Sequence, residues 1–177
     1  LGLSSVSNIS STSSFLTFTR IKEPRYSKLF PIMLSPKSNV RALPSSPKEV
    51  VKYFSEVTKC FYIDGITDED IVKLADKMLK IYDDELASAK EYDWYIGDLK
   101  KEIATNKSNG YKVSSYEISA STDVEYFTED GHDCARLWCT YNVKNGKELV
   151  KLNEVFILRK DDNSHWRIFG WEQVNER

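Results

Sequence analysis

The last third of the chain constrains the fold more than any other part. Residues 133–172 form three apolar stretches, and the turn sequences Asn145-Gly146 and Asp161-Asp-Asn-Ser164 separate them, while Asp130-Gly131 precedes the first stretch. Two-residue Asp-Gly and Asn-Gly loops favour the hairpin turn that matches the twist of antiparallel strands. The pattern predicts antiparallel strands at 111–121, 124–128, 133–144, 147–160 and 165–173.

The same turns predict which side chains share a face, because side chains alternate along a strand. The Asp-Gly loop sets Glu125 against Arg136, and the Asn-Gly loop sets Leu137 against Glu154 and Trp138 against Asn153. A four-residue loop at 161–164 sets Glu154 against Trp171. The face expected to meet the helices carries Val124, Tyr126, Ala135, Leu137, Cys139, Tyr141, Val150, Leu152, Phe156, Leu158, Phe169 and Trp171. Glu154 is the charge stranded in the middle of this face.

The opposite face is rich in aromatic and aliphatic side chains for a surface in contact with water. It is expected to carry, among others, Trp138, Asn153, Ile157, Trp166 and Ile168. Apolar patches of this kind mark interaction surfaces. A homodimer through these five residues is the expected partner interaction, and cover by the N-terminal segment is the alternative.

Three helices are expected before the strands. Ser46-Pro-Lys-Glu49 has the cap, the proline and the acid of a helix start, and the helix is expected to end at Asp64-Gly65. A second helix begins at Thr67, and its apolar stripe runs to Leu86. A third covers 91–105. Helices followed by a meander of strands predict an α+β domain over residues 47–177.

Residues 1–46 differ from this domain. They are rich in Ser and Thr, and they predict a disordered linker or a truncated leader, or else a transit peptide. Residues 1–47 hold six basic residues and one acid, or +5, and the whole chain carries −2, so residues 48–177 carry −7. An acidic domain argues against nucleic acid as a partner. No apolar run approaches the ~18 residues that cross a bilayer.

The closing segment Leu158-Arg-Lys-Asp-Asp-Asn-Ser-His-Trp-Arg-Ile-Phe-Gly-Trp-Glu172 resembles that of the NTF2-like (SnoaL-like) superfamily. This resemblance implies a cone with a pocket between the concave face of the sheet and the helices. Pro47-Lys-Glu-Val-Val-Lys-Tyr-Phe54, Tyr82-Asp-Asp-Glu-Leu86, Ser121-Thr-Asp-Val-Glu-Tyr-Phe127 and Asn153-Glu-Val-Phe-Ile-Leu-Arg-Lys160 are similar to an uncharacterised family of small bacterial proteins. That similarity implies a membrane-anchored, extracytoplasmic location and no assigned catalytic residues, although this chain shows no anchor.

Glu154 is the candidate catalytic residue. A carboxylate among apolar side chains has a raised pKa, which suits a general base or acid. The alternative is a structural carboxylate bonded to a helix group such as Tyr53, Tyr82 or Tyr95. The expected ligand pocket is lined by Tyr53, Tyr82, Tyr95, Tyr126, Leu137, Phe156 and Trp171.

Other chemistry has little support in the sequence. Cys60, Cys134 and Cys139 lack metal-ligand spacing and are expected to be buried thiols, and His132 and His165 are expected to be solvated turn residues. No metal or cofactor is therefore expected. A non-catalytic module that binds a small apolar ligand or a protein is the favoured function, and a small isomerase or hydrolase using Glu154 is the alternative.

Overall fold

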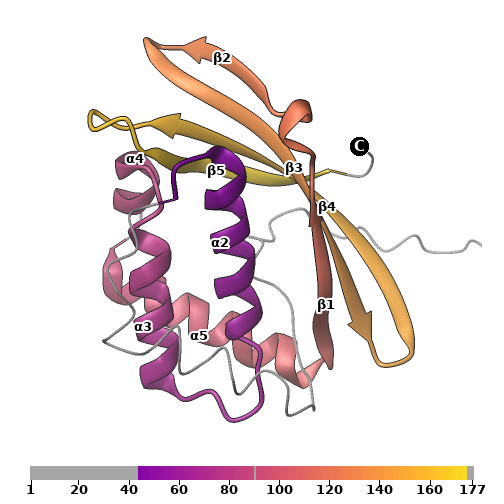
Figure 1. Ribbon diagram of the computed structural model, residues 1–177. Coiled ribbons are helices and arrows are strands. Elements are labelled where there is room, and N and C mark those ends of the chain that lie inside the picture. The colour runs from indigo at the N-terminus through magenta and orange to yellow at the C-terminus, as the bar shows by residue number, and fades with distance from the viewer. Residues whose placement is uncertain (1–43, 90, 175–177) are drawn as a thin grey trace, which may run out of the picture.

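The computed structural model describes residues 44–89 and 91–174 and has an α+β architecture (Figure 1). In this part of the chain the helices come first and an antiparallel sheet follows, as the sequence predicts. The elements are α2 (Pro47–Cys60), α3 (Asp68–Leu79), α4 (Asp84–Ser88), α5 (Tyr92–Ser108), β1 (Tyr111–Ile118), the short 3-10 turn η2 (Ser121–Asp123), β2 (Glu125–Glu129), β3 (His132–Asn145), β4 (Glu148–Lys160) and β5 (Trp166–Val174). Most of the expected tail, residues 1–43, lies outside the described residues.

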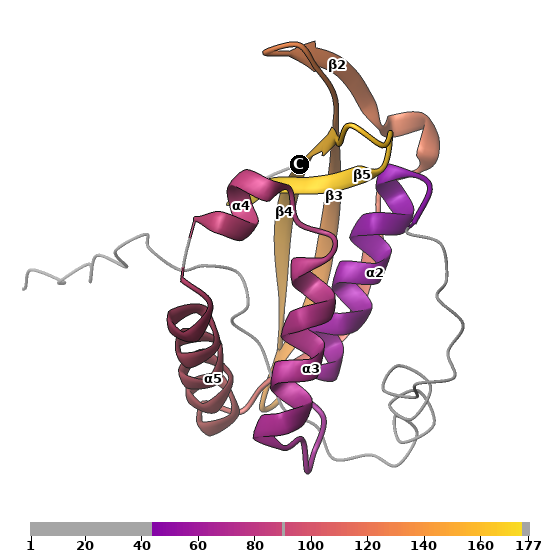
Figure 2. The ribbon, with the colours of Figure 1, turned by 90° about the vertical axis from the view of Figure 1, so that its left-hand side faces the viewer.

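The sheet has the order β1-β3-β4-β5, and β2 pairs with β3 on the same edge as β1. The helices α2 and α3 lie side by side over one face of the sheet, and α5 lies beside α3 (Figure 2). None of the described helices is both long enough and apolar enough to cross a bilayer.

The helix starts follow the sequence closely. Ser46 caps α2 by accepting a hydrogen bond from the Glu49 backbone N–H at 3.3 Å. The Glu49 carboxylate also accepts hydrogen bonds from the backbone N–H and hydroxyl of Ser45 at 3.0 and 2.9 Å. Thr67 and Asp70 form a full capping box at the start of α3, so both local signals position their helices.

The second helix is shorter than the sequence predicts, because α3 ends at Leu79 rather than near Leu86. The next residues pair with the outer edge of β5: the Ile168 N–H donates to Ile81, and the Asp83 N–H donates to Ile168, both at 2.8 Å. The Asp83 carboxylate then caps α4 through the Glu85 N–H at 3.0 Å. A helix cannot continue through residues whose backbone groups are used by a strand, so this tertiary contact overrides the helical stripe.

The first two predicted hairpins differ in how closely the structure follows them. The β2–β3 hairpin is confirmed, since Glu125 lies opposite Arg136 with a 3.2 Å ion pair. In the β3–β4 hairpin Asn145 pairs with Glu148, so the turn is Gly146-Lys147 and the register is shifted by two residues. A shift of two leaves every side chain on its predicted face, because the side-chain period of a strand is two.

The β4–β5 hairpin corrects the predicted faces. Lys160 lies opposite Trp166, and Phe169 is the extra residue of a bulge between the Leu158–Ile168 and Ile157–Gly170 pairs. The bulge reverses the alternation on its N-terminal side. Trp166 and Ile168, expected on the outward face, are therefore 8% and 0% exposed and belong to the core, so that expectation is wrong.

Phe169 takes the opposite position from the one expected. Its ring is half-buried and lies 3.3 Å from the guanidinium carbon of Arg159, an outward-facing residue of β4.

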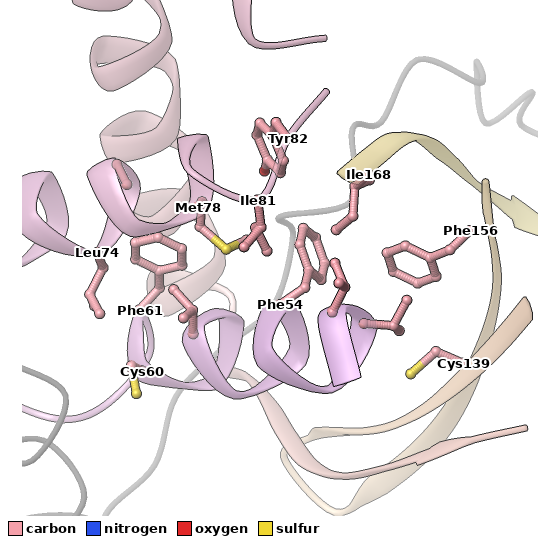
Figure 3. Packing of buried hydrophobic residues seen from close by; sticks show 14 of the residues in the cluster. Phe54, Cys60, Phe61, Leu74, Met78, Ile81, Tyr82, Cys139, Phe156 and Ile168 are labelled. Atoms are coloured by element: carbon pink, nitrogen blue, oxygen red, sulfur yellow. The ribbon is translucent and has the colours of Figure 1, made fainter. Parts of the chain in front are cut away.

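The core fills the space between α2, α3 and the inner face of the sheet (Figure 3). Phe54 of α2 points from its helix toward Ile81 and Phe156 and joins the helical and strand parts of this core (Figure 3). Cys60, Cys134 and Cys139 are buried and form no disulfide, as expected.

Candidate functional site

The inner face of β4 places Glu154 in the interior. Its side chain is 0% exposed, which confirms the predicted direction. The register shift gives it different neighbours from those expected: Cys139 of β3 and Gln173 of β5 lie opposite it, instead of Leu137 and Trp171. Glu154 is thus enclosed by the sheet it belongs to and by the helices above it.

The hydrogen bonding of the Glu154 carboxyl differs from the expected one. Neither oxygen has a hydrogen-bond partner within the described residues, so the expected bond to Tyr53, Tyr82 or Tyr95 is wrong. Burial raises the pKa of the Glu154 carboxyl well above its usual value. A buried carboxyl without a cation or donor is stable mainly in its neutral form, because burying an unpaired charge is unfavourable.

A small polar cluster that the sequence analysis missed lies beside Glu154. The Ser55 hydroxyl of α2 lies 2.7 Å from the Tyr141 hydroxyl and 3.7 Å from the Cys139 sulfur, and it is 2.9 Å from the Val51 carbonyl. Burial raises the pKa of the Cys139 thiol to about 12, and the Glu154 charge adds to this rise.

The pKa of the Tyr141 hydroxyl is raised as well. Burial first, and then the charges of Cys139 and Glu154, raise the Tyr141 pKa well above its usual value. Cys139 and Tyr141 share the predicted inner face with Glu154, so the register itself contained the signal that these three groups meet.

Four aromatic rings pack together on the side of Glu154 toward Phe156, the next inward residue of β4. The ring of Phe54 lies 5.2 Å from Phe156 and 5.1 Å from Trp171, and Tyr82 lies 5.7 Å from Trp171. Phe156 and Trp171 stack at 6.2 Å. Of the expected pocket residues, Tyr82, Phe156 and Trp171 are therefore brought together, and Phe54 is an addition from α2.

The other expected pocket residues lie elsewhere. Leu137 is a fully buried core residue, and Tyr126 is 62% exposed with its ring 5.9 Å from Trp166, so it does not join the four rings. Tyr53 is half-buried, and burial, with a contribution from Cys60, raises its pKa. Tyr95 is the exception, since it is half-buried beside Tyr82, and burial raises its pKa to about 12.

Exposure changes steeply along the inner face of β4. Val150 is 44% exposed, Leu152 is half-buried and Glu154 is fully buried. On β5 the inward residue opposite Glu154, Gln173, is exposed. The inward-facing residues Val150 and Leu152, called the apolar strip here, therefore lie between the exposed end of β4 and the buried Glu154.

The outward face keeps three of its five expected residues. Trp138, Asn153 and Ile157 are half-buried there, and Asn153 accepts a hydrogen bond from the Thr140 hydroxyl at 2.8 Å. Val155 between them is 8% exposed. The face is apolar at its centre even without Trp166 and Ile168.

The two histidines lie at strand ends, away from the site. His132 is exposed, and the half-buried His165 has its Nδ1 at 3.5 Å from Asp161. Among the described residues no three His, Cys, Asp or Glu side chains gather as they would around a metal ion.

A comparison with known protein families finds a match over residues 37–171 to the family described as Domain of unknown function (DUF6715). The chain belongs to this family. The DUF6715 region includes Glu154, the polar cluster and all four rings. No curated protein matches the chain.

Proposed function

We propose that this DUF6715 chain is a non-catalytic binding module with an NTF2-like arrangement, which takes a small apolar ligand on the inner face of its sheet. The supporting observation is the apolar strip of Val150 and Leu152, which lies on the inner face of β4 next to the buried Glu154, with the rings of Phe156 and Trp171 beyond it. Ligand sites are commonly apolar and aromatic, with few polar groups that fix orientation.

A binding role has better support than the isomerase or hydrolase alternative. A general base acts within hydrogen-bond reach of the proton it removes, and a second group usually orients it. The neighbouring hydroxyl of Tyr141 is within hydrogen-bond distance of Ser55, and no described group bonds to Glu154. The described part of the chain thus offers one acid and no orienting donor for it.

A homodimer through the outward face remains part of the proposal. Trp138, Val155 and Ile157 form its apolar centre, and the Thr140–Asn153 bond satisfies polar groups within it. Apolar centres with internally satisfied polar groups are common in homodimer interfaces.

The ligand proposal is tested with N-phenyl-1-naphthylamine, a neutral apolar dye that fluoresces when it leaves water. We expect saturable binding of one dye per chain. Leu152→Asp is expected to weaken binding about tenfold or more, because it places a charge on the strip. Leu149→Asp is the matched control, since Leu149 lies on the same strand, faces outward and is 58% exposed.

Equal effects of the two variants, or no saturable binding by the wild type, would overturn the proposal. Circular dichroism of both variants checks that a loss of binding does not reflect unfolding.

A further inference from the structure

Among the residues that the structure describes, no cation compensates a charge on the Glu154 carboxyl. The groups that face it are Cys139 and Tyr141 of β3, Ser55 of α2 and Gln173 of β5, and none of them is a cation. The nearby cation of α2, Lys59, is paired with Glu56 at 3.5 Å and lies over the Tyr116 ring at 5.5 Å. Both oxygens of Glu154 are thus left for a group from outside the described residues.

Aromatic rings stand next to this free acceptor. Phe156 follows Glu154 on the same face of β4, and Trp171 and Phe54 pack against Phe156. Ring faces attract cations, and the attraction is strongest where water is excluded. A carboxylate with aromatic neighbours on the same face of the sheet is complementary to an ammonium group, whereas a neutral apolar ligand would leave the carboxyl oxygens without a partner.

The apolar strip of Val150 and Leu152 is complementary to the apolar part of such a ligand. Val150 and Leu152 can contact an alkyl or aryl body, and the domain as a whole is acidic, which attracts cations. We propose that the ligand of this site is a small amine with an apolar body, whose ammonium group pairs with ionised Glu154 while its body lies along Val150 and Leu152. This inference rests on the proposed function and narrows it to one class of ligand.

The pairing makes binding proton-linked. Free Glu154 holds a proton because burial favours the neutral form, and an arriving ammonium group favours the carboxylate. That proton leaves to solvent as the ion pair forms, so charge balances. The affinity for an amine is therefore expected to rise with pH, by up to about tenfold for each unit below the raised pKa.

The test compares n-hexylammonium with n-hexanol, which have the same alkyl body and different heads. Binding is followed on the full chain by chemical-shift changes of backbone amides on β4 and β5, from pH 5.5 to 7.5. We expect hexylammonium to bind more tightly than hexanol and to tighten with pH. Glu154→Gln should weaken hexylammonium binding about tenfold or more and remove the preference of the site for hexylammonium over hexanol.

Four other results of these binding measurements would overturn the amine inference. Equal binding of the two probes, or hexylammonium binding that survives Glu154→Gln, would overturn the amine inference and leave the apolar site intact. Hexanol affinity that falls as pH rises would show a protonated Glu154 donating to a neutral acceptor, and would also overturn it. Shifts from neither probe would remove both this inference and the proposed function. The wild-type pH series decides the question even if the glutamine variant does not fold.

Discussion

Replacing Glu154 by glutamine is expected to change how the stability of the domain depends on pH. Glutamine has nearly the same shape and cannot ionise, so the substitution isolates the titration of one buried group. In the folded chain burial raises the Glu154 pKa well above its usual value of 4.5. In the unfolded chain the same carboxyl is solvated and titrates near 4.3.

The direction in which stability changes with pH follows from the number of protons that the folded and unfolded states bind. Between the unfolded and folded pKa values the folded state keeps a proton that the unfolded state has released, so unfolding becomes easier as pH rises. The stabilisation from neutral Glu154 is fully present below about pH 4.3 and is lost as pH rises toward the raised folded pKa. Within this window the loss is about 1.4 kcal/mol per pH unit.

Urea denaturation of the wild type and Glu154→Gln at half-unit steps from pH 5 to 7 measures the effect. The difference in free energy of unfolding between the two proteins is expected to shift by up to about 1.4 kcal/mol per unit in favour of the variant as pH rises. Taking the difference cancels the titration of the other carboxylates. Glu172→Gln on the exposed, outward side of β5 is the matched control and should keep the wild-type dependence.

A flat difference across this range would refute the reasoning, because it would mean that Glu154 is ionised and compensated in the folded chain. A difference that changes in favour of the wild type would require a cation near Glu154.

Other substitutions test the surrounding packing and the outward face. Phe156→Ala should lower the free energy of unfolding by about 3–5 kcal/mol, since it opens a cavity among three rings, and a loss below about 1 kcal/mol in urea titration would place Phe156 outside the core. Ser55→Ala should cost about 1 kcal/mol through the lost bond to Tyr141, and no change in urea midpoint would argue against that bond. Thr67→Ala should cost about 1 kcal/mol by removing the α3 cap, and an unchanged thermal midpoint would contradict this. Trp138→Asp should convert a dimer to a monomer in analytical ultracentrifugation, and a wild type that is already monomeric would end the homodimer proposal.

The inward direction of Glu154 is predictable from local sequence, because it depends only on whether the strand register shifts by an even or an odd number of residues. The hairpin turns place Glu154, Cys139 and Tyr141 on one face under any even shift, so the two-residue error at Gly146-Lys147 leaves the face unchanged. The same error misidentifies the direct neighbours of Glu154, since moving the turn by one residue along the chain moves each partner by two positions.

Features set by contacts between distant segments escape such reasoning. The bulge at Phe169 places Trp166 and Ile168 in the core, and the turn sequence at 161–164 does not predict this bulge. The break after α3 exists because residues 81–83 pair with β5, although the apolar stripe continues through Tyr82. Likewise, only the packing of α2 on the sheet brings Ser55 to Tyr141 and Phe54 to Trp171.

The amino-acid sequence by itself determined the α+β order, the helix caps, the β2–β3 turn and the side of the sheet on which Glu154 lies, because each depends on residues close together in the chain. The tertiary structure decided that Glu154 makes no hydrogen bond within residues 44–89 and 91–174, which rings lie near it and where β5 changes face. These depend on distant backbone and side-chain groups competing for the same positions, and that competition is resolved only when the helices pack on the sheet.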